Sequence, residues 1–444
     1  MDGDKRILYL PLENRVRELD ARLLLSLTAA TANFQVVIGP KWLLALNIAA
    51  IPRGLYATKT LNKLDADGMR SAIHAGHAPL AWDDEGPGQI VPEIYLKGVD
   101  DGAVKLAGKI FAWGNHQAAT ISHKYPMEAS KVLASGNPRW DLLRPEYRAY
   151  YSTEVDAIRE RFGRFILINT NFSSYNTAFS DAAIAAIADE TGAFKKSDDS
   201  EQKILRDIVA FEKQTLEDYV SLLPFLSAAF PDHKIIIRPH PTEKHEVWAR
   251  LAHTLPNVEC VFERTVVPWM IAAEAVIQNS CTTGVEALTL GRPVVSYCRS
   301  KSDLQEWHLA NHVCPRVHDV GPLIERLRSF ISDPASFKEP LASGHKTLSK
   351  HISHFTGEPA SLVISKALVF YAHKLEKRGT KLPRSFSMAG SFRPYPDNHL
   401  YRRKVAPIQP SEIADKVVKL TRCNPNIGRV TITQVAESCF LFRR

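Results

Sequence analysis

The feature that most constrains this chain is the regular alternation of short apolar runs with amphipathic helical patterns. KRILYLPL is followed by a helical pattern over residues 16–33 and then by a second apolar run, FQVVIGP, which Gly39 and Pro40 close. The same alternation starts again near residue 165 with FILINTNF. Strands joined through helices pair in parallel, so the pattern predicts parallel sheets covered by helices on both faces.

A chain of 444 residues is too long for one ordinary hydrophobic core. We therefore predict an α/β architecture of two Rossmann-like, doubly wound domains that face each other, followed by a small extension. The expected boundaries are 1–163 for an acceptor-side domain and 164–350 for a nucleotide-sugar-binding domain. Residues 351–444 are expected to form a returning helix, a basic linker and a small helix-and-strand extension.

The composition indicates a soluble globular protein, with 45% hydrophobic and 23% charged residues. No apolar run approaches the ~18 residues of a membrane-spanning helix, and the first residues carry charges where a signal peptide is apolar. We therefore expect a cytoplasmic protein. The six cysteines have no CxxC or metal-like spacing, which favours free thiols and no structural zinc.

The net charge of +8 favours an anionic partner. Much of the excess lies in residues 374–404, which could contact the anionic inner face of the plasma membrane or an anionic acceptor, or serve only as a solvated linker. No nucleic-acid-binding module is recognisable. The polar stretch 175–204 is predicted to be a lid or an acceptor-binding element, because loops of this length are often functional.

Ligands of open parallel sheets bind beyond the carboxyl ends of the strands, so polar residues that follow apolar runs are the candidates for a site. Arg238 and His240 follow a run of three isoleucines, and Pro239 and Pro241 restrict the backbone around them. A histidine held in this way can donate to a phosphate oxygen or protonate a leaving phosphate. A simple capping role for His240 stays open.

A second candidate is the turn in VIQNSCTTGVEALTLGRPVV, where a strand is expected to end at Gln278 and a helix to begin at Val285. Hydroxyl groups and the N–H groups of a helix N-terminus form a phosphate site, although the same residues cap ordinary helices. The hydroxyl groups are those of Ser280, Thr282 and Thr283, and Gly284 permits close approach. This turn follows RPHP by one strand-and-helix step, which favours a single phosphate site shared by the two motifs.

A third candidate is the acidic motif Asp83, Asp84 and Glu85, which stands at a strand end before a Gly-Pro-Gly turn. Crowded carboxylates raise the proton affinity of at least one member, which suits a general base. A solvated acidic turn is the alternative, and no companion ligands are spaced to complete a metal site. Asn171 follows the strand at FILIN and is expected to face the cleft.

In order and placement, DDEG, RPHP and QNSCTTGVEAL resemble three motifs of bacterial polysialyltransferases and capsule Kdo transferases, which are GT-B glycosyltransferases that use CMP-activated sugars. The longer pattern, which includes YLPLENRVRELDARLLLSLTAA, FAWGNHQ and SGNPRWDLLRPEYRAYY, resembles the bacterial family of surface carbohydrate biosynthesis proteins. This likeness covers most of residues 7–310.

The resemblance implies a metal-independent transferase that needs no cofactor and moves a CMP-linked acidic sugar, such as Kdo or a sialic-acid-like sugar, to a glycan or lipid-linked glycan. His240 would contact the nucleotide phosphate and assist its departure, and Glu85 or Asp84 would be the general base. The expected nucleotide- and phosphate-binding residues are Asn171, Arg238, His240, Pro241, Gln278, Ser280, Thr282, Thr283, Gly284 and Glu286.

Other functions remain open at this stage. The same fold could carry a CDP-glycerol-type glycerophosphotransferase or a nucleotide-sugar epimerase, and a non-catalytic subunit could dock on a membrane through its basic segment. The sequence also leaves open whether transfer inverts or retains the anomeric configuration.

Overall fold

The computed structural model describes residues 6–84, 88–179, 198–263, 265–383, 385–387, 392–394 and 405–444. Glu85, most of the predicted lid and much of the basic linker lie outside these residues. The chain divides into two units. Unit 1 contains Met1–Glu85, Gly98–Tyr150 and Ile352–Arg444, and unit 2 contains Gly86–Lys97 and Tyr151–His351. The division therefore follows the packing of segments that are distant in sequence, and it groups residues 352–444 with the N-terminal unit.

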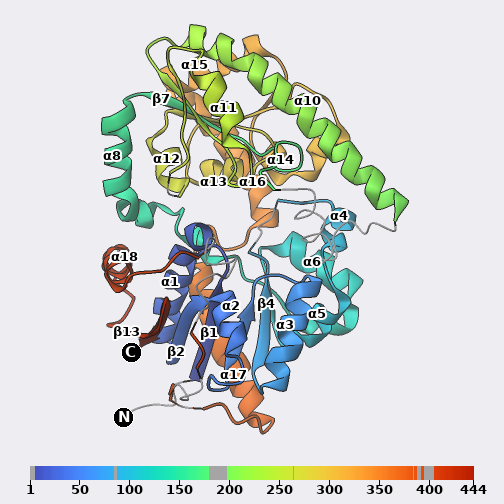
Figure 1. Ribbon diagram of the computed structural model, residues 1–444, viewed down its shortest axis with the longest axis vertical. Coiled ribbons are helices and arrows are strands. Elements are labelled where there is room, and N and C mark those ends of the chain that lie inside the picture. Colours follow the sequence, from blue (N-terminus) through green and yellow to red (C-terminus); the bar gives the residue numbers. More distant parts are fainter. Residues whose placement is uncertain are drawn as a thin grey trace. The chain divides into compact units, whose positions relative to one another are not determined.

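Unit 1 is built on an eight-stranded sheet with the order β13-β14-β2-β1-β3-β4-β5-β6 (Figure 1). Six strands are parallel: β1 (Arg6–Leu12), β2 (Phe34–Pro40), β3 (Leu55–Thr58), β4 (Ala78–Trp82), β5 (Ile110–Ala112) and β6 (Val132–Ala134). The strand order reverses at β1, because β2 lies on one side of it and β3 on the other. The carboxyl ends of β1 and β3 thus mark the crevice in which doubly wound sheets bind ligands.

Helices of the expected amphipathic kind cover this sheet. The helical elements of unit 1 are α1 (Arg15–Thr31), α2 (Lys41–Leu46), α3 (Lys63–His74), α5 (Asp101–Leu106), α6 (Asn115–Lys124), η1 (Pro126–Lys131), α7 (Pro138–Asp141), η2 (Pro145–Tyr151), α17 (Ala360–Lys377) and α18 (Pro410–Cys423). Helix α1 begins after Asn14, whose side chain accepts a hydrogen bond from the Arg17 amide. This cap fixes the start of α1 directly after β1.

The C-terminal segment completes unit 1. Strand β14 (Cys439–Arg443) pairs antiparallel with β2, and β13 (Thr431–Ala436) forms the edge of the sheet. Helix α17 is anchored by the buried Asp141 carboxylate, which accepts the backbone N–H groups of Ala360 and Ser361 at 2.8 Å each. These bonds explain why the predicted extension packs with the first unit.

Asp141 is expected to make the stability of unit 1 depend on pH. Burial raises its pKa from 3.8 to about 6. A carboxyl group that binds its proton more tightly in the folded state stabilises the fold at low pH, and this contribution declines as pH rises from about 4 to about 6. The decline is worth about 3 kcal/mol. Chemical unfolding of wild type and of Asp141→Asn at several pH values measures this decline. The unfolding free energy of wild type should fall more steeply with rising pH than that of the variant.

A non-titrating cap provides the control for this experiment. Asn62 accepts the amide of Asp65 at the start of α3, at 2.9 Å. Replacing Asn62 with Ala should lower the unfolding free energy by about 1 kcal/mol at every pH. Parallel pH profiles for wild type and the Asp141→Asn variant would contradict the prediction.

Unit 2 contains a six-stranded parallel sheet with the order β12-β11-β10-β7-β8-β9. The strands are β7 (Phe165–Asn169), β8 (Lys234–Arg238), β9 (Val258–Cys260), β10 (Ala275–Gln278), β11 (Val294–Tyr297) and β12 (Arg316–Val317). This is the order of the dinucleotide-binding Rossmann sheet, with its reversal between β7 and β10. The predicted end of a strand at Gln278 is confirmed.

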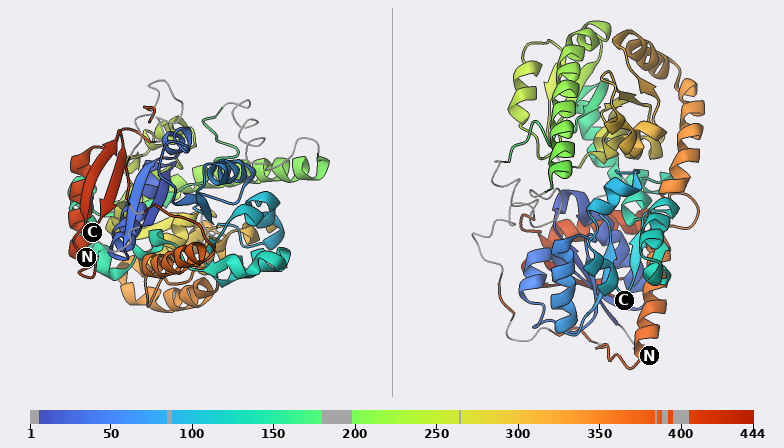
Figure 2. Two further views of the ribbon diagram at one scale, coloured as in Figure 1. Left: turned by 90° about the horizontal axis from the view of Figure 1, so that it is seen from below. Right: turned by 90° about the vertical axis from the view of Figure 1, so that its right-hand side faces the viewer.

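The helical elements of unit 2 are α4 (Pro92–Lys97), α8 (Ser152–Phe162), α10 (Asp199–Ala229), α11 (His245–Ala252), α12 (Val267–Ala272), α13 (Thr282–Thr289), η3 (Asp303–Trp307), α14 (Leu309–Val313), α15 (Val320–Ser332), η4 (Pro334–Phe337) and α16 (Lys338–His351). The buried residues of α10 begin only at Thr215, and the first half of this helix projects past its sheet (Figure 2). Among the described residues, no helix has both the length and the apolarity needed to cross a membrane.

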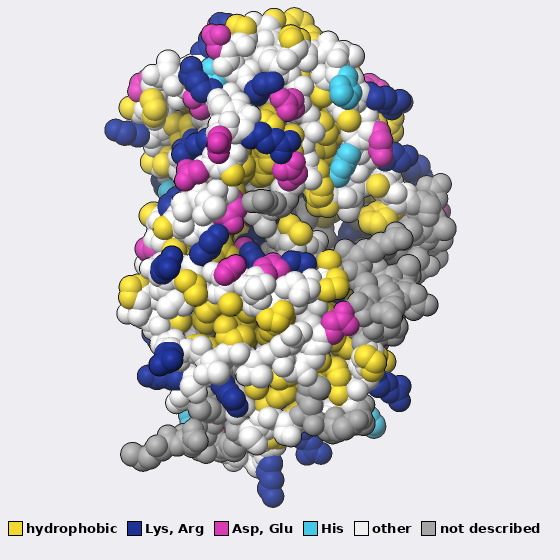
Figure 3. Space-filling model, turned by 60° about the vertical axis from the view of Figure 1, so that its left-hand side comes forward, with side chains coloured by type: hydrophobic (Ala, Val, Ile, Leu, Met, Phe, Trp, Pro, Cys, Tyr) yellow, Lys and Arg dark blue, Asp and Glu magenta, His cyan; other side chains and the backbone are white. Residues whose placement is uncertain are grey.

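The surface charge is mixed on the face drawn in Figure 3, where Lys and Arg side chains alternate with Asp and Glu side chains. The described basic side chains therefore do not form one basic patch on this face.

Candidate functional site

The loops that leave β7 and β10 are joined at the switch point of unit 2. The backbone N–H of Asn171 donates to Asn279 Oδ1 at 3.0 Å, and Asn279 Nδ2 donates to the Asn171 carbonyl oxygen at 3.2 Å. Asn279 is buried, and Asn171 is partly exposed. This reciprocal pair fixes the spacing of the two loops at the place where a Rossmann sheet binds its ligand.

His240 follows β8 at the same edge of the sheet and has a defined tautomer. Its Nδ1 accepts the backbone N–H of Thr242 at 3.3 Å and lies 2.7 Å from Thr242 Oγ1. Because a backbone N–H can only donate, Nδ1 is an acceptor and the proton of the neutral ring lies on Nε2. Nε2 is then the nitrogen that can donate to a phosphate oxygen. The adjacent Pro241 is exposed.

The buried carboxylate of Glu243 organises the loops after β7 and β8. It accepts five hydrogen bonds at 2.7–3.3 Å, from Thr170 Oγ1, the amides of Phe172 and His240, Asn176 Nδ2 and Trp248 Nε1. Sequence reasoning missed Glu243, although an acid three residues after the histidine of a strand-end turn was a usable signal. Glu243 sets the backbone position of His240 directly.

Glu212 of α10 holds the next part of the loop after β7. It accepts the amides of Ser174 and Tyr175 at 2.7 and 2.9 Å. Burial raises the pKa of Glu212 to about 7, against the opposing effect of these hydrogen bonds, and the charge of Glu243 adds to the rise. Glu212 therefore changes its protonation near neutral pH at the edge of the candidate site.

Arg238 is packed into the unit rather than extended from it. It donates to the Glu263 carbonyl oxygen at 2.7 Å, and its guanidinium group lies 5.5 Å and 5.4 Å from the ring centres of Phe262 and Trp269. Burial lowers its pKa to about 10. The structure thus uses Arg238 to hold β8 against the segment after β9, and its predicted contact with phosphate stays a prediction.

The turn between β10 and α13 is shaped by Gln278 and Gly284. Gln278 Oε1 accepts the Cys281 amide at 2.8 Å, and its amide nitrogen bonds Ser296 Oγ. A Cβ atom on Gly284 would lie 2.7 Å from Gln278 Cγ, so the close approach that requires glycine is to this side chain. Gln278 and Gly284 are therefore architectural residues of the turn.

The three hydroxyl-bearing residues of this turn are each partly exposed, although the Oγ1 atom of Thr283 is itself buried. Ser280 has a φ of 52° and accepts Asn311 Nδ2 at 2.9 Å, while Thr282 and Thr283 stand partly exposed in the first turn of α13. Glu286 is fully buried one turn later. The structure brings the turn of β10 and the loop of His240 to the same edge of one sheet, on either side of β7.

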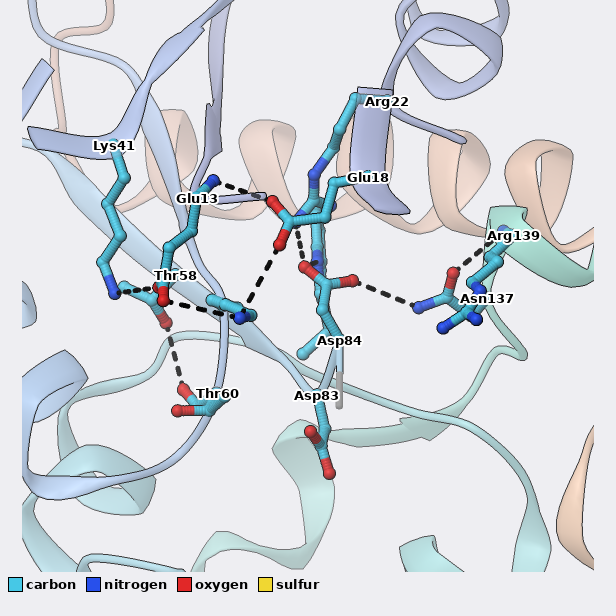
Figure 4. Close-up of polar contacts among 12 residues, drawn as sticks. Glu13, Glu18, Arg22, Lys41, Thr58, Thr60, Asp83, Asp84, Asn137 and Arg139 are labelled. Atoms are coloured by element: carbon cyan, nitrogen blue, oxygen red, sulfur yellow. Dashed lines mark hydrogen bonds and ion pairs between the residues drawn. The ribbon is translucent and has the colours of Figure 1, made fainter. Parts of the chain in front are cut away.

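In unit 1, consecutive strands deliver charged residues to the carboxyl edge of the sheet (Figure 4). Glu13 follows β1, Lys41 follows β2 and Lys59 follows β3. Lys41 Nζ lies 2.9 Å from Asp65 and 3.2 Å from Glu13, and Lys59 Nζ lies 3.6 Å from Glu13. Sequence reasoning missed these residues, although the strand-end rule applied to the first three strands would have found them.

The acidic motif joins this network through Asp84. Asp84 forms an ion pair with Arg22 of α1 and accepts Trp82 Nε1 at 3.3 Å and Asn137 Nδ2 at 3.4 Å. Asp83 points away from Asp84 and accepts Gln117 Nε2 at 3.2 Å (Figure 4). Glu85 lies outside the described residues.

Glu18 of α1 is the buried carboxyl group beside Asp84. Its Oε2 accepts the Glu13 amide at 2.8 Å, and its Oε1 lies 3.6 Å from Lys59 Nζ. Burial and the charge of Asp84 raise the pKa of Glu18, against the effects of Lys59 and Arg22. Crowding of carboxylates thus increases the proton affinity of Glu18, which sequence reasoning did not consider.

A small pocket of about 10 Å³, measured as the space open to the centre of a water-sized sphere, lies beside these groups. Its lining residues are Arg17, Glu18, Ala21, Arg22, Asp84, Asn137, Pro138 and Arg139. Within the described part of the chain, no three His, Cys, Asp or Glu residues are grouped so that they could hold a metal ion.

No family model matches the chain, and no curated protein matches it. Among solved structures, a UDP-N-acetylglucosamine 2-epimerase aligns with 87% of this chain and 100% of its own at 11% identity and a TM-score of 0.52. The UDP-GlcNAc 2-epimerase of Methanocaldococcus jannaschii, in complex with UDP-GlcNAc and UDP, aligns with 82% of this chain and 99% of its own at 11% identity and a TM-score of 0.51.

The wall teichoic acid polymerase TagF aligns with 85% of this chain and 91% of its own at 11% identity and a TM-score of 0.44. Together with the two sheets and their interleaved helices, the epimerase likeness identifies the α/β fold as the GT-B type.

Proposed function

We propose that this chain is a glycosyltransferase that binds a nucleotide-activated sugar at the β7/β10 switch point of unit 2 and transfers the sugar to a glycan acceptor. The observation that carries the proposal is the loop set around His240, in which Glu243 holds the histidine amide and Thr242 directs the ring proton to Nε2. A hydrogen-bond donor that is held rigidly at a strand end can stabilise the leaving phosphate, because the donor does not have to reorient during the reaction.

The roles within the proposed site follow from charge. As the bond between the sugar and the phosphate breaks, negative charge develops on the phosphate oxygens, and His240 would stabilise it. The hydroxyl groups of Ser280, Thr282 and Thr283 and the first N–H groups of α13 would bind the same phosphate. A carboxyl group of unit 1 would accept the proton of the acceptor hydroxyl, with Glu85 and Asp84 as the candidates from the acidic motif.

The identity of the sugar donor is part of the same proposal and rests on the resemblance of DDEG, RPHP and QNSCTTGVEAL to motifs of transferases that use CMP-activated sugars. The donor would be a CMP-linked acidic sugar such as Kdo or a sialic-acid-like sugar, and the product a bacterial surface polysaccharide such as a capsule or lipopolysaccharide. The protein would act in the cytoplasm, with a peripheral contact at the membrane where a lipid-linked acceptor is made. Neither a metal ion nor a further cofactor is needed in this scheme.

Nucleotide binding is the first test. In calorimetric titrations with CMP, CDP and UDP, CMP is expected to bind most tightly, with no effect of EDTA. Thr282→Val combined with Thr283→Val should weaken CMP binding about tenfold or more, because hydrogen bonds to a charged phosphate are lost. Thr254→Val, which removes a hydroxyl that bonds Leu251 on the exposed end of α11, is the matched control. Failure of all three nucleotides to bind would refute the proposal.

A second candidate function is nucleotide-sugar epimerisation. It is favoured by the two UDP-GlcNAc 2-epimerase structures, which align over 99–100% of their own lengths. Tight binding of UDP and interconversion of UDP-GlcNAc with its 2-epimer would support this function instead. Release of CMP from CDP-glycerol would indicate a glycerophosphotransferase, and nucleotide binding without turnover would indicate a non-catalytic subunit.

A further inference from the structure

Two buried polar atoms of residues that line the unit 1 pocket make no hydrogen bond to any described residue. They are Glu18 Oε1 and Arg22 Nε, and both residues are only 4% exposed. Lys59 Nζ lies 3.6 Å from Glu18 Oε1, which is an ion-pair contact but no hydrogen bond. Buried polar groups in native proteins nearly always have hydrogen-bond partners, so two such atoms in neighbouring residues of one pocket require an explanation.

The two side chains stand one turn apart on α1, and residues four apart on a helix are neighbours on one face. Glu18 Oε2 and Arg22 Nη2 are already engaged. Glu18 Oε2 accepts the Glu13 amide at 2.8 Å, and Arg22 forms its ion pair with Asp84 (Figure 4). These bonds hold both side chains in place. Glu18 and Arg22 are also lining residues of the pocket.

The unsatisfied pair is chemically complementary, because Glu18 Oε1 can accept a hydrogen bond and Arg22 Nε can only donate one. A phosphate or carboxylate would satisfy Arg22 alone, and an ammonium group would satisfy Glu18 alone. An alcohol satisfies both, since a hydroxyl group donates one hydrogen bond and accepts others. The pair therefore selects for a hydroxyl group.

We propose that this pocket binds the reacting hydroxyl group of the acceptor, and that Glu18, in place of Asp84 or Glu85 of the acidic motif, is the carboxylate that takes its proton. The inference rests on the proposed function and names its acceptor site. The raised pKa of Glu18 agrees with the assignment, because a base of higher proton affinity removes a proton more effectively.

The transfer step balances without a further reactant. The acceptor O–H proton moves to Glu18 Oε1 as the acceptor oxygen forms its bond to the anomeric carbon of the donor. The bond from that carbon to the phosphate oxygen breaks, and the nucleotide leaves with the electron pair. Arg22 Nε–H donates a hydrogen bond to one lone pair of the acceptor oxygen, which orients this oxygen and leaves its other lone pair for the attack.

Asp84 supports this arrangement rather than competing with it. Its carboxylate is engaged by Arg22, Trp82 and Asn137, which positions the Arg22 guanidinium group. Its charge also contributes to the raised pKa of Glu18. The charged groups around Glu18 in the described structure are Glu13, Arg17, Arg22, Lys59, Asp84 and Arg139.

The test uses Glu18→Gln in the full-length chain, because glutamine keeps the size and one acceptor oxygen but cannot take the proton. With CMP-N-acetylneuraminic acid or CMP-Kdo as donor and water or capsular oligosaccharide as acceptor, CMP release should fall at least about 100-fold. The affinity for CMP should not change, because CMP is assigned to unit 2. Asp20→Asn, which alters an acid on the same helix that pairs with Lys416, should keep wild-type activity.

Thermal unfolding supplies a readout that needs no substrate. A carboxyl group with a raised pKa in the folded state costs stability as pH rises above its unfolded value. Glu18→Gln removes that cost, so the ligand-free variant should unfold at the same temperature as wild type or a higher one at pH 8. The difference should shrink toward pH 4. A purely structural role for Glu18 predicts the opposite, a lower unfolding temperature.

The outcomes separate the two proposals. If wild type binds CMP and Glu18→Gln retains activity within a few-fold, or loses activity only in proportion to lost folded protein, the assignment of Glu18 is overturned. If no nucleotide binds to wild type, the proposed transferase function fails. In that case a lower unfolding temperature of Glu18→Gln would overturn the hydroxyl site as well, and a higher one would support a hydroxyl site that serves another reaction.

Discussion

Replacing His240 with Asn is expected to slow the release of CMP from a CMP-linked sugar by about 100- to 10,000-fold, the range typical for loss of a proton donor or acceptor in the transition state. Asparagine can still accept the Thr242 amide through its side-chain oxygen, but it cannot deliver a proton to the leaving phosphate. The loss should appear mainly in kcat, because the developing charge exists only in the transition state. Steady-state measurement of CMP release checks the result.

The matched control is His253→Asn, which alters an exposed histidine at the end of α11 in the same unit. Its rate should equal that of wild type. An His240→Asn variant with full kcat and a raised KM alone would show that His240 only binds the donor. Full activity in both parameters would remove His240 from the site.

Replacing Glu243 with Ala is expected to lower the unfolding free energy of unit 2 by about 3 to 5 kcal/mol, among the largest effects that one substitution produces. Five hydrogen-bond donors lose their acceptor at once, and several of them are buried. A buried donor without an acceptor destabilises the folded state, because its lost hydrogen bonds to water are not replaced. Chemical unfolding followed by Trp fluorescence is a direct measurement, because Trp248 is itself one of the five donors.

Glu246→Ala is the control for this substitution, since Glu246 lies exposed on α11. It should change the unfolding free energy by less than about 0.5 kcal/mol. Glu243→Ala should also weaken CMP binding at temperatures where it is still folded, because the His240 amide and the loop after β7 lose their common anchor. A stability loss below about 1 kcal/mol would mean that the donors find other partners.

The strands and most of the helices could be predicted from local patterns. β7, β8 and β10 appear where apolar runs were found, and β10 ends at the predicted residue. Strand β3 has only four residues, LYAT, and was not anticipated as a strand. Of the edge hairpin, only strand β13 was anticipated, because β14 becomes buried by pairing with β2, which lies just over 400 residues earlier in the chain.

The sequence predicted which turns form the candidate site in unit 2, but it did not predict what each residue of those turns contacts. His240, Ser280, Thr282 and Thr283 lie at the expected edge of the sheet. Arg238, Gln278 and Gly284 are instead engaged within the fold, because each finds a partner that a linear pattern does not display.

By itself the sequence determined the α/β class, the two doubly wound units and the strand ends that carry polar residues, because periodicity and turn chemistry are properties of neighbouring residues. Only the tertiary structure decided that Asp141 anchors α17, that Glu243 gathers five donors, and that Glu18 and Arg22 meet Asp84 across more than 60 residues of chain. Burial and charge pairing act through space, so the groups whose proton affinities they change cannot be identified from sequence neighbours.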